Sequence, residues 1–201
     1  MRIKANPKYD SFMAELRLAR GRLSKWRGVA FRAAPLEFAR LAKLLDGRGG
    51  LQRGGRWLAP GVGCVVNLST TQETAIGESS ANFTYYNFAS RDVKPKVIVA
   101  VRLKLNKVFD LTDPRNFSSS PWLPLKEFLA EDWRKTNDHG LESQSQVFGR
   151  AARDTGAEAL LVPSARVSGG INLVYFPEVL VRASRTEILG EEELARWLKS
   201  R

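Results

Sequence analysis

The chain has 201 residues, 43% hydrophobic and 26% charged, so it can bury a core and is neither disordered nor fibrous. One cysteine, Cys64, excludes an internal disulfide, and one histidine, His139, argues against a His-based zinc site or a Ser-His triad. The net charge of +11 is local, because residues 1–56 carry 14 basic and 4 acidic side chains whereas residues 57–201 carry 18 and 17. This excess predicts an anionic partner: nucleic acid, an acidic membrane or a phosphorylated ligand.

The membrane is the weakest of these partners. No apolar run approaches the roughly 20 residues of a spanning helix, and the start, MRIKANPKYD, lacks the apolar stretch of a secretory signal. We therefore expect a cytoplasmic protein with a reduced thiol at Cys64.

The N-terminal quarter begins with a predicted helix over residues 11–23, whose other face is basic. Ser11 is its candidate N-cap, and its apolar residues recur at helical spacing: Phe12, Leu16, Ala19 and Leu23. A short strand over 26–33 follows. A helix over 35–45 then starts with proline, and the glycine-rich stretch 47–55 ends it.

The middle of the chain continues with a buried strand over 64–69. Ser69-Thr70-Thr71 followed by Gln72 and Glu73 is a cap signal for a helix that runs to about residue 81. The β-branched run at 97–105 predicts a strand, 111–114 a loop, and 124–135 a helix.

The C-terminal part contains a polar loop at 136–145 and a helix over 147–155 that Gly156 stops. Two strands, 158–166 and 171–180, precede a tail helix at 190–200. Strands and helices mix without strict βαβ alternation. The sequence therefore predicts one α+β domain with a split or bent sheet, preceded by a basic helical extension over residues 1–25.

The stretch Gly54-Gly55-Arg56-Trp57 is the first candidate for chemistry, because glycines let a ligand approach the backbone and an arginine fork binds phosphate. It matches neither G-x-G-x-x-G nor a Walker loop. On pattern alone, a surface turn with solvated charges is the favoured interpretation.

A second candidate is Glu78, which shares a helix face with Ala75 and can point inward. A carboxylate there is either a paired structural charge or a catalytic group, and the residue alone favours the structural role. Ser164, Arg166 and Asn172 lie where strands meet loops, a common place for function, although serine and asparagine there are usually turn formers.

Polar residues gather just before the predicted helix 147–155, at Ser143, Gln144, Ser145 and Gln146. Their simplest role is a helix cap, for which Ser145 fits. His139 is expected to be a solvent-facing loop residue, since no acid and nucleophile accompany it.

Taken together and in order, these segments resemble the RES domain, a family named for an arginine, a glutamate and a serine. The resemblance runs from about residue 26 to 180 and rests on VAFR (29–32), GGRW (54–57), STTQETAIGE (69–78), VFDLTDP (108–114), EDW (131–133), SQSQVFGRAA (143–152), EALLVPSAR (158–166) and NLVYFPE (172–178). It implies a toxin of a bacterial toxin–antitoxin pair. Such toxins degrade NAD⁺ by splitting the nicotinamide–ribose bond, with phosphate or water as acceptor, on a fold similar to ADP-ribosyltransferases.

The resemblance also assigns residues. Arg32 and Arg56 match the family's pocket arginines and Glu78 its glutamate, while either Ser143 or Ser164 matches the serine. Substrate-binding positions follow from the same motifs: Phe31, Gly54, Gly55, Arg56 and Asn67. Two positions depart from the family pattern, because Leu58 replaces the asparagine of GGRWN and Asn67 replaces a tyrosine.

The implied chemistry suits these residue types. A carboxylate at Glu78 can stabilise the oxocarbenium-like ribose, and Arg32 and Arg56 can bind the pyrophosphate or inorganic phosphate. We expect no metal and no cofactor, with NAD⁺ as substrate and phosphate as a possible co-substrate. The resemblance implies a helix-turn-helix (Xre-like) antitoxin in a hetero-oligomer, with DNA bound only through it. The alternatives are an ADP-ribosyltransferase that modifies a protein, and a catalytically impaired protein that binds through its basic N-terminal segment.

Overall fold

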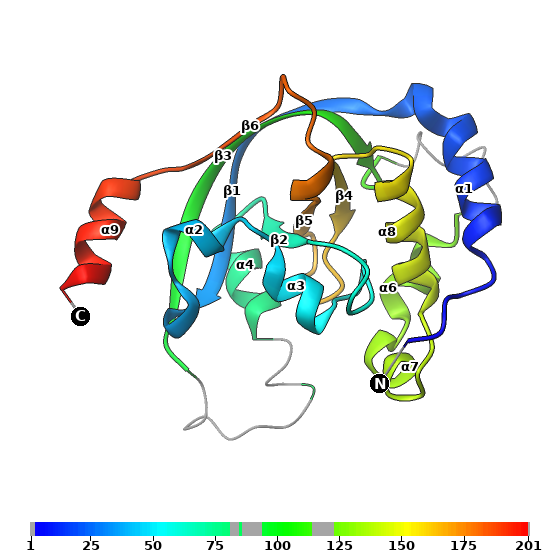
Figure 1. Ribbon diagram of the computed structural model, residues 1–201, viewed down its shortest axis with the longest axis horizontal. Coiled ribbons are helices and arrows are strands. Elements are labelled where there is room, and N and C mark those ends of the chain that lie inside the picture. The colour runs from blue at the N-terminus through cyan, green and yellow to red at the C-terminus, as the bar shows by residue number, and fades with distance from the viewer. Residues whose placement is uncertain (1–2, 81–84, 86–93, 114–122, 201) are drawn as a thin grey trace.

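The computed structural model describes residues 3–80, 85, 94–113 and 123–200, and Figure 1 shows their arrangement. The helices are α1 (Tyr9–Leu18), α2 (Leu41–Leu44), α3 (Arg48–Arg53), α4 (Gln72–Ser79), α6 (Leu125–Ala130), α7 (Trp133–Asp138), α8 (Gln144–Asp154) and α9 (Glu191–Lys199). The strands are β1 (Ser24–Pro35), β2 (Val66–Ser69), β3 (Lys96–Asp110), β4 (Ala159–Pro163), β5 (Ile171–Tyr175) and β6 (Arg185–Ile188). Short 3₁₀ turns occur at Ala19–Arg22, Leu36–Phe38 and Pro177–Val179.

The strands form one strongly bent sheet in the order β1-β2-β5-β4-β3-β6, and a further pairing of β1 with β3 closes it on itself. The long antiparallel β1–β3 ribbon curves around the molecule (Figure 1). Only β3 and β4 pair in parallel; the other pairings between these strands are antiparallel. The predicted fold class, an α+β domain with a bent sheet, is confirmed.

Two hydrophobic clusters lie on opposite faces of this sheet. Along β4, Leu160 and Val162 point to the cluster beneath α1, α6 and α8, while Ala159 and Leu161 point to the other. This alternation is what a strand buried on both faces requires. We call the first side the helix-covered face and the second the inner face.

The N-terminal helix α1 belongs to this core. Phe12 packs edge-on against Phe128 and Phe148, with ring centroids 5.9 and 5.7 Å apart. The helix α1, which lies in the segment expected to be an extension, thus contributes its apolar face to the domain. The helix starts at Tyr9, so Ser11 is an exposed residue within it and not its N-cap.

Two predicted helices are broken in the structure. The segment 35–45 becomes a 3₁₀ turn and the short α2, because Arg40 is extended (ψ 129°). This break directs Leu41 and Leu44 onto the inner cluster. The segment 124–135 splits into α6 and α7 at Glu131, whose ψ is 133°. The glycine-rich stretch forms α3, and β6 pairs with β3 although its sequence, RTEI, carries no strong strand pattern.

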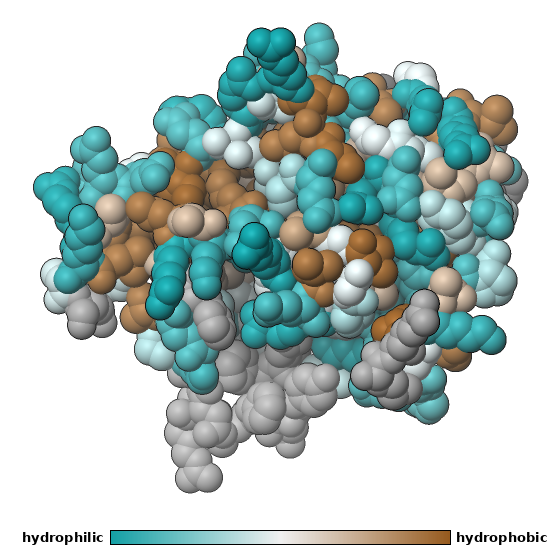
Figure 2. All heavy atoms as spheres, viewed as in Figure 1, coloured by the Kyte–Doolittle hydropathy of each residue, from teal (hydrophilic) through white to brown (hydrophobic). Residues whose placement is uncertain are grey.

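Other predicted elements are confirmed with small shifts in their bounds: β1, β2, α4, α8, β4 and α9. The strands predicted over 97–105 and 171–180 are also present, but β3 continues to Asp110 and β5 already ends at Tyr175, before the 3₁₀ turn at Pro177–Val179. Figure 2 shows one face of the molecule on which hydrophilic side chains are interrupted by apolar ones, some of them beside α9. Within the described ranges, no helix combines the length and the apolarity that crossing a bilayer demands.

Candidate active site

A cavity of about 280 Å³ opens on the helix-covered face, between α4, the glycine loop before Trp57, α7 and the ends of β2 and β5. Six of the residues predicted to form the site line it: Phe31, Gly54, Gly55, Arg56, Asn67 and Glu78. The site assembles because β2 and β5 pair, which brings the α4 segment beside the loop after β4.

Glu78 lies in the last turn of α4, whose start is fixed by the Thr71 hydroxyl accepting a hydrogen bond from the Thr74 amide at 3.2 Å. Its Oε1 accepts hydrogen bonds from Ser164 Oγ at 2.5 Å and from Asn172 Nδ2 at 2.7 Å. Within the described part of the chain, no hydrogen bond reaches Oε2. The carboxylate is therefore fixed through one oxygen and offers the other to a ligand.

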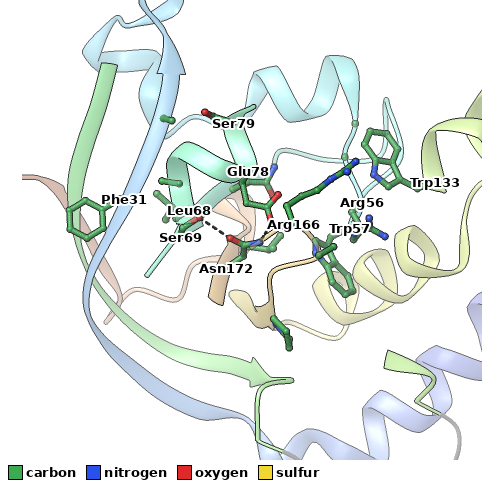
Figure 3. A pocket seen from close by; sticks show the side chains of 18 of the residues that line it. Phe31, Arg56, Trp57, Leu68, Ser69, Glu78, Ser79, Trp133, Arg166 and Asn172 are labelled. Atoms are coloured by element: carbon green, nitrogen blue, oxygen red, sulfur yellow. Dashed lines mark hydrogen bonds between the residues drawn. The ribbon is translucent and has the colours of Figure 1, made fainter. Parts of the chain in front are cut away.

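The two donors to Glu78 are themselves held in place. Ser69 Oγ donates to Asn172 Oδ1 at 2.8 Å, which fixes the amide so that its nitrogen faces Glu78 (Figure 3). Ser164 Oγ accepts from the amides of Arg166 and Val167 at 3.1 and 2.9 Å, so its hydroxyl proton is directed at the carboxylate. A chain of hydrogen bonds thus determines the position of this negative charge.

The loop that carries Arg56 is shaped by close packing. Gly54 has φ +67°, and a Cβ there would lie 2.6 Å from Pro60 Cδ, so a glycine is required. Arg56 Nη1 donates to the carbonyl oxygens of Phe128 at 2.5 Å and Glu131 at 3.0 Å. Burial lowers the pKa of Arg56, and the nearby Glu78 carboxylate partly opposes that shift. The guanidinium is thus anchored through Nη1, and Arg56 is among the residues that line the cavity.

The polar motif at 143–146 supports this loop and does not enter the cavity. Ser143 is the N-cap of α8 and forms a capping box with Gln146, whose Nε2 donates to the Gly55 carbonyl at 2.8 Å. The expectation that Ser145 is the cap is wrong, because Ser145 lies in the first turn and donates its hydroxyl to Glu131 at 2.9 Å. Of the two candidate serines, the structure brings Ser164 to Glu78 and leaves Ser143 buried as a cap.

Arg32 is not brought to the cavity, which corrects the expectation that it lines the site. Phe31 pairs with Ser69 across β1 and β2 and shares its side of the sheet, so Arg32 points to the inner face with Ala30 and Ala34. Its buried Nη1 has no hydrogen-bond partner among the described residues. Burial lowers the pKa of Arg32 to about 10, and the Asp46 carboxylate opposes that shift.

Among the cavity residues that sequence reasoning missed are Trp133 and Arg134, at the start of α7. The available signal was the EDW motif, in which Asp132 caps α7 by accepting from the Lys135 amide at 3.1 Å. Figure 3 shows Trp133 and Arg56 together to one side of Glu78. Of the two departures from the family pattern, Leu58 is fully buried while Asn67 faces the cavity.

Metal-ligating side chains are sparse in the described ranges, where no group of three His, Cys, Asp or Glu residues could hold an ion. The ionisable residues that line the cavity are instead three arginines, Arg56, Arg134 and Arg166, and one glutamate, Glu78. That set can bind an anion and stabilise a positive charge at neighbouring points.

Comparison with known proteins gives two positive findings. A family model described as the RES domain matches residues 29–197. A chain of the crystal structure of the M. tuberculosis MbcT–MbcA toxin–antitoxin complex is similar over 96% of this chain and 100% of that chain, with a TM-score of 0.63 and 20% sequence identity. No curated protein matches the sequence. At 20% identity, this similarity shows that the two chains share a fold.

Proposed function

The chain belongs to the RES domain family, and from that premise we propose that it is the toxin enzyme of a bacterial toxin–antitoxin system. Its reaction is the degradation of NAD⁺ by cleavage of the nicotinamide–ribose bond, with inorganic phosphate or water as the acceptor. The observation that carries this proposal is the Glu78 carboxylate, held through Oε1 and open at Oε2, in a cavity lined by arginines.

The reaction needs little from the protein beyond placed charges. The bond between ribose C1′ and the nicotinamide nitrogen breaks, and its electron pair leaves with nicotinamide, which becomes neutral. The ribose becomes oxocarbenium-like, and a carboxylate oxygen close to it lowers the energy of that cation. An oxygen of phosphate or of water then attacks C1′, and water loses a proton in doing so.

Each residue around Glu78 has a role in this account. Ser164 and Asn172 are positioning residues, since they hold Oε1 and direct Oε2 towards the cavity. Arg56 supplies positive charge for phosphoryl oxygens, and its anchoring to two backbone carbonyls limits the entropy lost on binding. Substrate positioning of this kind lowers barriers by fixing the reacting groups beforehand.

A toxin of this kind requires an inhibitor in the cell that makes it. We propose a cognate helix-turn-helix (Xre-like) antitoxin that forms a hetero-oligomer with this chain, so that DNA is bound only through the antitoxin. The similar M. tuberculosis structure is a toxin–antitoxin complex, which supports an antitoxin partner. The cluster of basic side chains in residues 1–56 suits an acidic surface on that partner.

The test is to incubate the purified full chain with NAD⁺, with and without phosphate, and to follow nicotinamide release. The proposal predicts release by the wild type and almost none by Glu78→Gln. Faster release in phosphate, with ADP-ribose 1″-phosphate as product, identifies phosphate as the acceptor, and equal release with free ADP-ribose identifies water. No release in either buffer would overturn the proposal. Labelled ADP-ribose attached to a protein would replace it with the transferase.

A further inference from the structure

The strand β2 carries a polar residue, Asn67, at a position where its sequence is otherwise apolar. Asn67 is exposed and lines the cavity, whereas Val66 and Leu68 on either side of it are buried. β2 is a central strand of the sheet, between β1 and β5. Asparagine is depleted in strands, because its side chain competes for backbone hydrogen bonds. A residue that breaks a local preference in this way is expected at a functional position.

The Asn67 carboxamide has no hydrogen-bond partner among the residues that the structure describes. The carboxamide of Asn172, on the neighbouring strand β5, is instead held on both sides, by Ser69 and by Glu78. Asn67 Nδ2 lies beside the glycine loop, 3.8 Å from the position that a Cβ on Gly55 would occupy. Asn67 therefore keeps two N–H donors and a carbonyl acceptor for a ligand in the cavity.

The register of β2 with β5 places Asn67 beside the hydrogen-bond chain that holds Glu78. Ser69 pairs with Asn172 on β5, and Asn67 pairs with Val174. Residues two apart on a strand share one face of the sheet and lie about 6.6 Å apart along it, so Asn67 and Ser69 line the cavity together. From Ser69 the chain of hydrogen bonds runs through Asn172 to Glu78 (Figure 3). Asn67 is thus one strand repeat away from the start of that chain.

This spacing suits the base of NAD⁺ that leaves in the proposed reaction. The ribose carbon that Glu78 is proposed to face carries the nicotinamide nitrogen, and the carboxamide of nicotinamide is close to that nitrogen on the same pyridine ring. Adenine lies beyond the diphosphate and a second ribose. A residue one strand repeat from the chain that holds Glu78 is therefore within range of the nicotinamide and far short of the adenine.

We propose that Asn67 is a specificity-determining residue whose side-chain carboxamide pairs with the carboxamide of nicotinamide when NAD⁺ is bound in the cavity. Two carboxamides are complementary, because each presents an N–H donor beside a carbonyl acceptor. The inference rests on the proposed function and adds the group by which the site recognises the leaving base. Because the pairing holds the pyridine ring, Asn67 controls the binding of ligands that carry nicotinamide and leaves ligands without that base unaffected.

The experiment is calorimetric binding to the full chain that carries Glu78→Gln, in which NAD⁺ should persist, with and without Asn67→Leu. The ligands are NAD⁺, its acetylpyridine analogue, in which a methyl group replaces the amide nitrogen, and ADP-ribose, which has no nicotinamide. We expect Asn67→Leu to weaken NAD⁺ binding about 5- to 30-fold, through the loss of two hydrogen bonds, and to leave ADP-ribose binding unchanged. With Asn67 in place, the acetylpyridine analogue should bind about three- to tenfold more weakly than NAD⁺, and in Asn67→Leu the two dinucleotides should bind alike.

Gln52→Leu is the matched control, because it removes a carboxamide from an exposed position on α3 that does not line the cavity. It should leave the binding of all three ligands unchanged. Strands accommodate leucine at least as well as asparagine, so the melting temperature of Asn67→Leu should equal or exceed that of its parent. A weaker affinity for NAD⁺ then reports a lost contact and not a lost fold.

The outcomes separate this inference from the proposed reaction. Equal losses of affinity for NAD⁺ and ADP-ribose in Asn67→Leu would assign Asn67 to another part of the dinucleotide and overturn the pairing. Unchanged affinity for NAD⁺ would make Asn67 a solvated residue of the cavity wall and overturn it as well, even in a protein that releases nicotinamide. Conversely, a preference for NAD⁺ that depends on Asn67, in a chain whose wild type releases no nicotinamide, would uphold the pairing and overturn the reaction. Failure of NAD⁺ to bind at all would overturn both.

Discussion

Two glutamates flank the loop that carries Arg56, and they are built in opposite ways. Glu131 accepts through both oxygens, from the amides of Gln144 and Ser145 and from the Ser145 hydroxyl, at the start of α8. Among the residues that the structure describes, Glu78 accepts through one oxygen only, from the side chains of Ser164 and Asn172. The first carboxylate is consumed by the fold, while the second is positioned by it. A carboxylate satisfied on one side and facing a cavity has capacity left for a ligand.

The same contrast explains the two serines. Ser143 uses its hydroxyl to cap α8, a local task that stabilises one helix. Ser164 comes to Glu78 from 86 residues away along the chain, and its hydroxyl links the carboxylate to the loop that holds Arg166. The comparison therefore predicts that changes around Glu78 affect turnover and changes around Glu131 affect stability.

The largest expected effect is that of Glu78→Gln on nicotinamide release. The amide keeps the shape of the side chain and loses its negative charge, so the rate should fall about 10²- to 10³-fold, as when one group that stabilises a transition state is removed. The free energy of unfolding should change by less than about 1 kcal/mol. Steady-state rates and a denaturant titration measure the two quantities. A large loss of stability would mean that Glu78 is a structural charge, and the difference in role between Glu78 and Glu131 would then not hold.

The same substitution at Glu131 should lower the stability of the protein and leave its rate of nicotinamide release nearly unchanged. Glu131→Gln places an amide where both oxygens accept hydrogen bonds at a helix N-terminus, so we expect a loss of about 2 kcal/mol in stability. For a chain of this size, that loss lowers the melting temperature by about 4–8 °C. The rate per folded molecule should stay within about threefold of the wild type. A rate loss as large as that of Glu78→Gln would contradict the assignment.

The two serines allow the same comparison of rate and stability, with smaller expected effects. Ser164→Ala removes one of the two donors to Glu78 and should lower the rate about tenfold with little change in melting temperature. Ser143→Ala should cost about 1 kcal/mol of stability through loss of the cap, with the rate per folded molecule unchanged. If Ser143→Ala lowered the rate and Ser164→Ala lowered the stability, Ser143 and not Ser164 would be the functional serine of the family.

Substitution of Arg32 should give the smallest effect, and it should raise the stability of the protein rather than lower it. Burial holds the pKa of Arg32 at about 10, below that of an exposed arginine, so the folded state binds this proton less tightly than the unfolded state does. The buried charge therefore costs stability below pH 10, and the cost falls as the pH rises through that value. At neutral pH, Arg32→Met should stabilise the protein by about 1 kcal/mol, whereas Arg27→Met, at an exposed site on the same strand, should have little effect. Loss of nicotinamide release in Arg32→Met would return Arg32 to the active site.

The parts of the fold that follow from local chemistry were predictable. The β-branched run of β3, the Thr71 cap of α4 and the amphipathic α9 are each written in a short stretch of sequence. The breaks at Arg40 and Glu131 were not, because they depend on distant partners: α2 turns onto the inner cluster, and Glu131 leaves its helix to bind the start of α8. The strand β6 was missed because its four residues gain their structure from pairing with β3.

The candidate site divides in the same manner. The glycine loop, Glu78 and the loop residues Ser164, Arg166 and Asn172 could be singled out from sequence, since they stand at the ends of predicted elements. The choice between Ser143 and Ser164 requires knowing that β4 and β5 pair beside α4. The face on which Arg32 lies depends on the register of Phe31 with Ser69, which no local pattern encodes. Trp133 and Arg134 were not predicted because they lie at the start of α7, and the sequence indicated one continuous helix over 124–135 instead of a new helix beginning there.

The most direct test of the central claim is the identification by mass of the products that the wild-type chain makes from NAD⁺. Cleavage at the carbon that Glu78 is proposed to face predicts nicotinamide together with ADP-ribose or ADP-ribose 1″-phosphate, and predicts their absence with Glu78→Gln. Nicotinamide mononucleotide and AMP would mean that the diphosphate is the bond attacked. That result, or NAD⁺ left intact, would contradict the account.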